Sequence, residues 1–147
     1  MIGATHWDLL VTLTFRKKMK QHDVTRSLKT LFIAIERSCF GRQNHLRIVR
    51  MPCIEHTADA THVHLVIKKP NHFSHRNFKN LLAAKWKKIK FSGWSNLRMT
   101  NKNGLTGWYE IIEDTETDRH KVTDYITKHV PHDFSTVDFE NVVTIDS

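Results

Sequence analysis

The sequence has few of the residues that mark secreted, membrane or nucleotide-driven proteins. Its 2 cysteines, Cys39 and Cys53, show no CxxC spacing and are too few for a disulfide framework or a four-thiolate zinc site. No apolar run approaches the roughly 18 residues that cross a bilayer, and the N-terminus lacks an apolar signal core. A GxxxxGK[ST] motif is also absent, so a helicase would be a separate chain. We expect an intracellular, cytoplasmic protein of a prokaryotic, plasmid or viral setting, with no membrane partner.

Length and charge narrow the class further. With 147 residues, of which 39% are hydrophobic, the chain can build one compact domain, which we assign to residues 1–131, followed by an acidic tail over 132–147. Its 23 Lys and Arg outnumber 15 Asp and Glu, for a formal charge of +8. Such an excess suits a phosphate-rich partner, either nucleic acid or an anionic membrane surface. Basic residues dominate 68–102, which has no acidic side chain.

Hydrophobic periodicity predicts an α+β fold. Apolar residues alternate from Trp7 to Phe15, as in a strand with one buried face, and Thr12 and Thr14 lie on the opposite face. The first expected elements are a strand over 7–15, a helix capped by Asp23 and ended by Gly41, and two strands over 46–54 and 62–67 that form a hairpin. A second helix, capped by Ser74, runs to about Ile89. A strand over 108–112 follows, and the last helix begins at Asp118 and ends before Pro131. We expect an antiparallel sheet with the first two helices on one face. Pro52 argues against a central place for the second strand.

A histidine pair lies on the third expected strand. His62 and His64, two residues apart, point to one face, while Val63 and Leu65 point to the other. Across the hairpin, Glu55 pairs with His62 and so joins the histidine face. Two imidazoles and one carboxylate suit Mg²⁺ or Mn²⁺. The alternatives are two chance histidines and a surface glutamate.

The last helix adds a tyrosine and a lysine. Val122, Tyr125, Ile126 and His129 share one helical stripe, so Tyr125 faces the protein, and Lys128 lies one turn away. Taken alone, Tyr125 reads as a core aromatic and Lys128 as a surface cation.

Together these segments resemble a known family. LVTLTF at 10–15, THVHLVI at 61–67 and DYITKHV at 124–130 are similar, in order and spacing, to the three motifs of HUH endonucleases, especially rolling-circle replication initiators with a single catalytic tyrosine. The resemblance implies a ferredoxin-like (RRM-like) fold with helices on one side and the DNA site on the other. It also implies nicking of single-stranded DNA through a 5′-phosphotyrosine, followed by strand joining, with Tyr125 as nucleophile and Lys128 as its cationic helper.

The third metal ligand stays open at this point. Glu55 is favoured as the third ligand, because its spacing before the histidine pair and the Tyr-x-x-Lys pattern both resemble those of replication initiators. Related single-strand transposases take the ligand four residues after the tyrosine, which is His129 here. His56 is a weaker candidate because it should face away from the pair.

Other residues are candidates for DNA contact. Thr12 and Thr14 of the first strand are two of them. The basic second helix also carries lysines that can contact the phosphate backbone of DNA, namely Lys79, Lys85, Lys87 and Lys88. Trp86, Trp94 and Trp108 can stack on bases, although core packing is the favoured interpretation for each.

Three alternative functions remain. The first is a single-strand tyrosine transposase, and the second is a non-catalytic ferredoxin-like binder of RNA or DNA, which would carry aromatic residues on its exposed strands. The third, a structural zinc protein, lacks thiolates beside the histidines.

Overall fold

The computed structural model describes residues 6–42, 45–93, 108–113, 115–129 and 137–144, without the side chains of 126–129 and 139. Its elements follow one another as β1 (Leu9–Thr14), α1 (Gln21–Phe40), β2 (Arg50–His56), β3 (Thr61–Ile67), α2 (His75–Lys87), β4 (Tyr109–Ile111), α3 (Glu116–His129) and the short 3₁₀ helix η3 (Phe139–Asn141). Among the described residues, no helix has the length and apolar character needed to cross a membrane.

The four strands form one antiparallel sheet in the order β2-β3-β1-β4. This order, with one helix between β1 and β2 and another between β3 and β4, is that of a ferredoxin-like α+β fold, so the fold-class prediction is confirmed. The long hairpin of β2 and β3 turns over residues 57–60, where the amide of Thr57 donates to the carbonyl of Ala60 over 2.9 Å. The two central strands, β1 and β3, are those that carry the Thr and His motifs.

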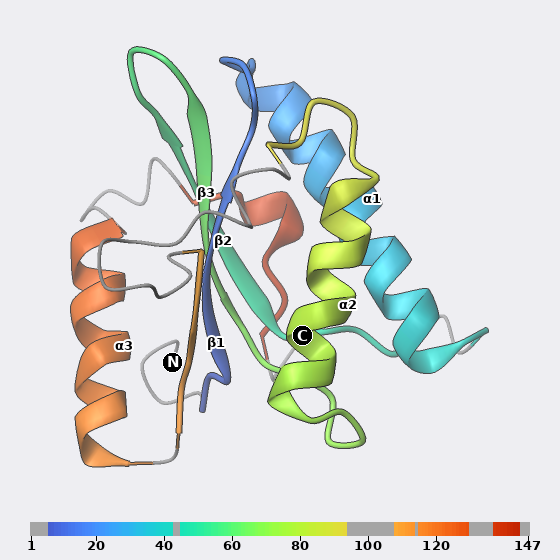
Figure 1. The fold of residues 1–147 in the computed structure, drawn as a ribbon, viewed down its shortest axis with the longest axis vertical. Coiled ribbons are helices and arrows are strands. Elements are labelled where there is room, and N and C mark those ends of the chain that lie inside the picture. The colour runs from blue at the N-terminus through green and yellow to red at the C-terminus, as the bar shows by residue number, and fades with distance from the viewer. Residues whose placement is uncertain (1–5, 43–44, 94–107, 114, 130–136, 145–147) are drawn as a thin grey trace.

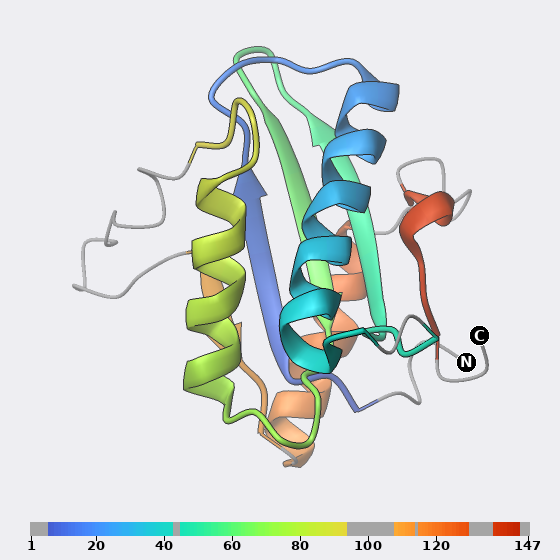
Figure 2. The same ribbon diagram turned by 90° about the vertical axis from the view of Figure 1, so that its right-hand side faces the viewer.

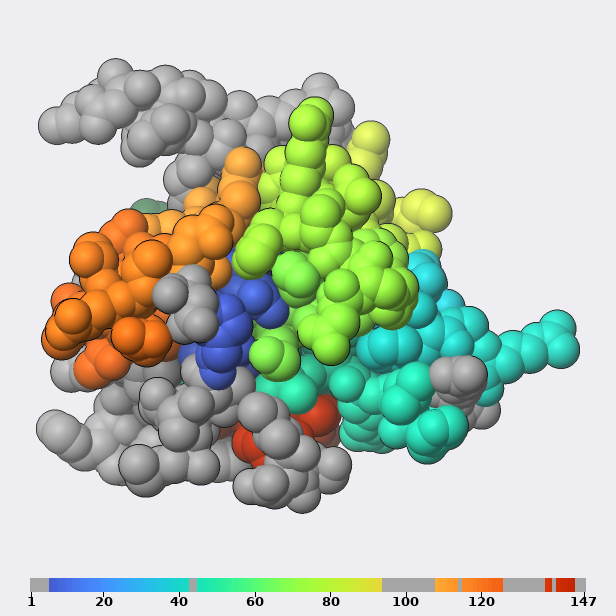
Figure 3. All heavy atoms as spheres, turned by 90° about the horizontal axis from the view of Figure 1, so that it is seen from below, coloured from blue at the N-terminus to red at the C-terminus, as the bar shows by residue number. Residues whose placement is uncertain are grey.

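Helices cover the sheet on both sides (Figure 1). As expected, α1 and α2 share one face, where they enclose a core that contains Leu13, Phe32 and Trp86. Helix α3 packs on the other face through Val122 and Tyr125, in a smaller cluster that surrounds Trp7, Leu10, Met51, Cys53 and Val66. Figure 3 shows α3 (orange) and α2 (green) on opposite sides of the start of β1 (blue).

Alternation along β1 explains the two faces. Leu9, Val11 and Leu13 enter the larger core, while Leu10 enters the smaller one. Trp7 was expected with the first set, but it packs in the smaller cluster. It precedes the strand, so the strand's alternation does not apply to it.

Helix boundaries follow local capping, with two corrections. Ser74 caps α2 as predicted, since its hydroxyl accepts from the amide of Asn77, and Gly41 ends α1 with a φ of 63°. The prediction that Asp23 caps α1 is wrong: α1 begins at Gln21, and the carboxylate lies in its first turn. Asp118 does not open α3 either, because α3 begins at Glu116 and the hydroxyl of Thr115 accepts from the amide of Asp118 at 3.1 Å.

Strand β2 is at an edge of the sheet, which is where Pro52 is tolerated. Its outer side is covered by the C-terminal segment, residues 137–144. Cys53 bridges to Val137 and Arg50 to Val143, and the amide of Asp138 donates to the carbonyl of Pro52. This part of the acidic tail therefore closes the exposed edge of β2 (Figure 2).

Candidate active site

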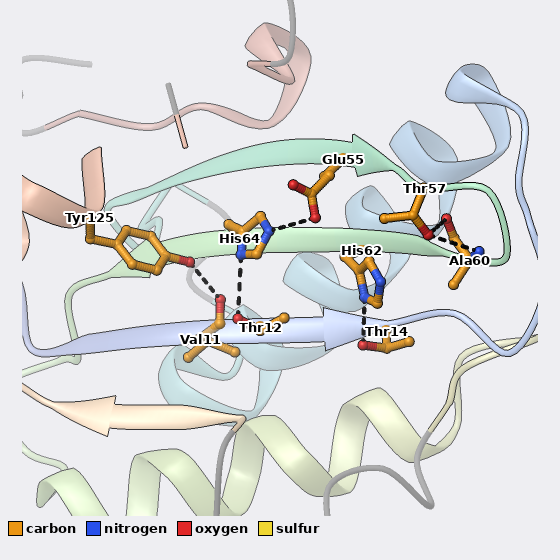
Figure 4. A network of polar contacts seen from close by, with 9 residues as sticks. All are labelled: Val11, Thr12, Thr14, Glu55, Thr57, Ala60, His62, His64 and Tyr125. Carbon is orange, nitrogen blue, oxygen red and sulfur yellow. Dashed lines mark hydrogen bonds and ion pairs between the residues drawn. The ribbon is translucent and has the colours of Figure 1, made fainter. Parts of the chain in front are cut away.

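The two histidines of β3 face the same side of the sheet as the two threonines of β1. Thr12 pairs with His64, and Thr14 pairs with His62. The residues between them, Val63 and Leu13, point into the larger core. Strand periodicity thus places four polar side chains on the α3 face, as the sequence predicts (Figure 4).

Each histidine ring contacts a threonine hydroxyl through Nδ1. The distance is 2.9 Å between Thr14 Oγ1 and His62 Nδ1, and 3.4 Å between Thr12 Oγ1 and His64 Nδ1. In the tautomer with its proton on Nδ1, the ring donates to the hydroxyl and presents the Nε2 lone pair outward. Metal-binding histidines are oriented in this way by a partner on the other ring nitrogen. The threonines therefore have a role in holding the rings that the sequence did not indicate.

Glu55 supplies a carboxylate beside this pair. It pairs with His62 across the hairpin, as predicted, and its Oε1 lies 3.3 Å from His64 Nε2. His56 faces the other way, as expected, because its ring contacts Thr61 and Gln21. As the side chains stand, the described residues contain no group of three His, Cys, Asp or Glu arranged to hold a metal ion. His62, His64 and Glu55 nevertheless place two imidazoles and one carboxylate on one face, and both groups are common ligands of divalent cations.

Tyr125 reaches this face from α3. Its ring centroid lies 6.0 Å from that of His64, in an edge-on arrangement, and its hydroxyl donates to the carbonyl of Val11 over 3.1 Å. Figure 4 shows the phenol pointing toward the Thr12 and His64 pair. Three segments distant in the sequence thus meet at one place on the sheet.

Burial sets the state of the phenol. Because the Tyr125 side chain is largely removed from water, its pKa rises well above the ordinary value, although the hydrogen bond with the Thr12 side chain acts in the opposite direction. The phenol is therefore neutral at physiological pH. A nucleophilic role for this oxygen would require that the proton leave, which a cation close to the oxygen favours.

Two predicted residues lie outside the described side chains. Lys128 and His129 belong to the last turn of α3, and only the backbone of this turn is described. The choice between Glu55 and His129 as third ligand thus rests on the contact of Glu55 with His64.

Comparisons with known proteins add no family to this geometry. No protein-family model, curated protein or solved structure gives a significant match to the chain. What the protein does must therefore be inferred from its own side chains.

The predicted DNA-contacting lysines are not beside the histidines. Lys79, Lys85 and Lys87 belong to α2, on the opposite face of the sheet, and Lys79 Nζ lies 4.8 Å from the Tyr109 ring. Lys88 follows the end of this helix and is exposed. Lys79, Lys85 and Lys87 therefore lie on the side of the sheet away from Tyr125.

The tryptophans pack as the favoured interpretation has it. Trp86 is fully buried and meets Phe15 edge-on at 5.0 Å, and Trp108 is buried in the same core. Neither is available to stack on a base. Trp94 lies outside the described residues.

Cys53 lies beside His64 on the same face of the sheet, where the two residues pair across β2 and β3, and it bridges to Val137. Burial raises the pKa of its thiol from 9.0 to about 11. Because only the thiolate reacts, we expect iodoacetamide at pH 8 to modify Cys53 about 100-fold more slowly in the native protein than in urea. The folded thiol also keeps its proton to higher pH than the unfolded one, so this group's contribution to stability is lost as the pH rises from 9 toward 11. Peptide mass spectrometry checks the rate, and equal native and unfolded rates would mean that Cys53 is not buried in the folded protein.

Proposed function

We propose that this chain is a metal-dependent, sequence-specific single-stranded DNA endonuclease of the HUH type that nicks DNA to initiate rolling-circle replication and rejoins strands. The observation that supports this best is the position of Tyr125, whose ring lies 6.0 Å from that of His64 although the two come from distant segments. A chance Tyr-x-x-Lys pattern has no reason to pack its tyrosine against a chance histidine pair.

His62, His64 and Glu55 would hold Mg²⁺ or Mn²⁺. Such a cation, when bound, polarises a non-bridging oxygen of the scissile phosphate. Thr12 and Thr14 fix the ring orientations through Nδ1, which leaves Nε2 for coordination. His64 Nε2 now faces the Glu55 carboxylate, so protons compete with the cation for this position.

Tyr125 is the nucleophile in this proposal. Its hydroxyl leaves the carbonyl of Val11, loses its proton and attacks phosphorus. A bond forms between the phenolic oxygen and phosphorus as the bond to the 3′-oxygen breaks, and the 3′-oxygen gains a proton, which balances the one that the phenol lost. The product is a 5′-phosphotyrosine and a free 3′-hydroxyl.

Strand joining follows from the same intermediate. A phosphotyrosine is a phosphodiester, so a 3′-hydroxyl can attack it and restore the DNA bond while Tyr125 leaves. Water is not a reactant in either direction. The substrate must be single-stranded, which in the cell calls for a separate helicase to open the duplex.

The decisive experiment is capture of the covalent intermediate. Wild-type protein with Mn²⁺ and a mixed-sequence single-stranded DNA library is expected to give an adduct on the peptide that contains Tyr125, and Tyr125→Phe is expected to give none, because the nucleophilic oxygen is missing. Denaturing gels and peptide mass spectrometry detect the adduct, and a chelator should abolish it.

The chain provides a matched control for this test. It has 2 tyrosines, and Tyr109 packs partly buried against the core of the other face. Tyr109→Phe should leave adduct formation at the wild-type level. If the library binds and the wild-type protein forms no adduct, the chain is a non-catalytic binding domain instead.

A further inference from the structure

A basic groove lies at the end of the sheet where β1 leads into α1. Its volume is about 560 Å³, and it is bordered by residues 17–30 on one side and 88–91 on the other. Figures 1 and 2 show both segments at the same end of the molecule as the start of β3. Six cationic side chains line the groove, together with one carboxylate, that of Asp23: Lys17, Lys18, Lys20, Arg26, Lys88 and Lys90.

The positive charge of the groove is not neutralised by the rest of the described chain. All six cationic side chains are exposed, and none forms an ion pair with a described carboxylate. Asp23 itself lies 3.2 Å from the ring of His22. Like charges held together raise the energy of the free protein, and a polyanion relieves this repulsion.

Phe91 gathers three cations around one ring. Lys17 Nζ lies 3.7 Å from the ring centroid, Lys90 Nζ 5.0 Å and Arg16 Cζ 5.4 Å. The backbone of Phe91 has a φ of 64°, a left-handed conformation that is unfavourable for an aromatic residue. Neighbouring hydrogen bonds hold it there, because its carbonyl accepts from Arg16 and the next residue but one, Gly93, donates to Thr14. Strain of this kind is typical of functional sites.

The groove adjoins the histidine face. The amide of Met19, on the groove wall, donates to the buried hydroxyl of Thr61 over 2.9 Å, and Thr61 directly precedes His62. On the other wall, Gly93 is bonded to Thr14, the partner of His62. The groove thus lies at the end of the sheet where β1 ends and β3 begins, beside the segments that carry Thr14 and His62.

We propose that this groove holds the phosphodiester backbone of the single-stranded DNA to one side of the phosphate that Tyr125 attacks. This inference rests on the proposed function, because it assumes that the scissile phosphate lies at the histidine face. A membrane surface fits less well, since membrane-binding sites present exposed apolar side chains, whereas Met19 and Ile89 are buried. Of the lysines predicted to contact DNA, Lys88 belongs to this groove.

The test is the salt dependence of DNA binding by full-length protein. For single strands, each phosphate contact contributes about 0.7 to the slope of log affinity against log salt. With fluorescein-labelled oligothymidine, Lys17→Gln/Lys90→Gln is expected to lower the slope by about 1.4. Arg37→Gln/Arg42→Gln removes the same charge at the far end of α1, where both side chains are exposed, and should leave the slope unchanged. Thermal unfolding verifies that both variants fold.

The outcomes separate this inference from the proposed function. Equal salt slopes for the groove variant and the control variant would contradict DNA binding in the groove. So would a groove variant that loses more binding to anionic lipid vesicles than to DNA. If wild-type protein forms the tyrosine adduct and the groove variant keeps the wild-type slope, the groove does not bind DNA, but the nickase function is supported. If the slope falls in the groove variant but wild-type protein forms no adduct, the groove binds DNA and the proposed nickase function is wrong.

Discussion

Glu36→Ala is expected to lower the free energy of unfolding by about 3 to 5 kcal/mol, a large share of the total for a domain of this size. Arg50 is 4% exposed, and its guanidinium meets the Glu36 carboxylate at 3.0 Å. Removal of the carboxylate leaves a buried cation without its ion-pair partner. The same carboxylate also accepts from the amide of Ile48 at 2.9 Å, so a second donor loses its acceptor. Urea unfolding followed by circular dichroism measures the change.

An exposed ion pair of the same length provides the control. Lys121 Nζ lies 3.0 Å from Glu110 Oε1, but both side chains are 48% exposed. Glu110→Ala should therefore leave stability unchanged within error, because water screens such a pair. A joint replacement, Glu36→Leu/Arg50→Met, should recover only part of what Glu36→Ala loses, because it removes the unpaired cation but leaves the amide of Ile48 and the carbonyl of Asn141 without these partners. If Glu36→Ala behaves like Glu110→Ala, burial does not strengthen this pair.

Arg50 also connects the sheet to the C-terminal segment. Its Nε donates to the carbonyl of Asn141, and the Asn141 side chain donates in turn to the carbonyl of Thr25 in α1. No sequence pattern indicates this connection, because its partners are backbone carbonyls far apart in the chain. From the sequence, residues 132–147 are an acidic tail, and the fold shows that residues 137–144 cover the edge of β2.

Those parts of the site that depend on strand periodicity were predictable. Two-residue alternation puts His62, His64, Thr12 and Thr14 on one face once the strands are recognised, and the turn between β2 and β3 sets Glu55 opposite His62. The ferredoxin-like fold follows from the same alternation together with two amphipathic helices. Strand periodicity does not determine which ring nitrogen meets a hydroxyl, and it therefore could not reveal the threonines as partners of the histidines.

Features that depend on tertiary packing were not predictable. The lysines of α2 share a basic segment with Lys88, yet the helix turns Lys79 toward Tyr109 on the face away from the histidines. The groove combines residues 17–20 and 88–90 of two basic runs that the sequence separates by a helix, a hairpin and another helix. The run over 16–20 was the available signal, because it follows directly on the strand that carries the threonines.

Mn²⁺ binding is expected to disappear in His64→Ala and to weaken about 10- to 100-fold in Thr14→Val. His64 contributes a ligand nitrogen in the proposed site, whereas Thr14 acts through His62, whose Nδ1 lies 2.9 Å from its hydroxyl. Valine has nearly the same shape as threonine but cannot accept the ring proton, so the His62 ring loses its fixed orientation. Isothermal titration calorimetry with Mn²⁺ and without DNA measures the affinity independently of cleavage.

Thr123→Val is the matched control for the threonine. The Thr123 hydroxyl is exposed and donates to the carbonyl of Arg119 within α3, away from the histidines, so its replacement should leave Mn²⁺ affinity unchanged. Because no DNA is present, a loss in Thr14→Val cannot come from a missing contact between the hydroxyl and the nucleic acid. Wild-type affinity in Thr14→Val with loss in His64→Ala would confine the threonines to DNA contact. Wild-type Mn²⁺ affinity in His64→Ala would mean that the metal does not bind at this face of the sheet. The largely buried, neutral Tyr125 would then lack the cation that its activation requires.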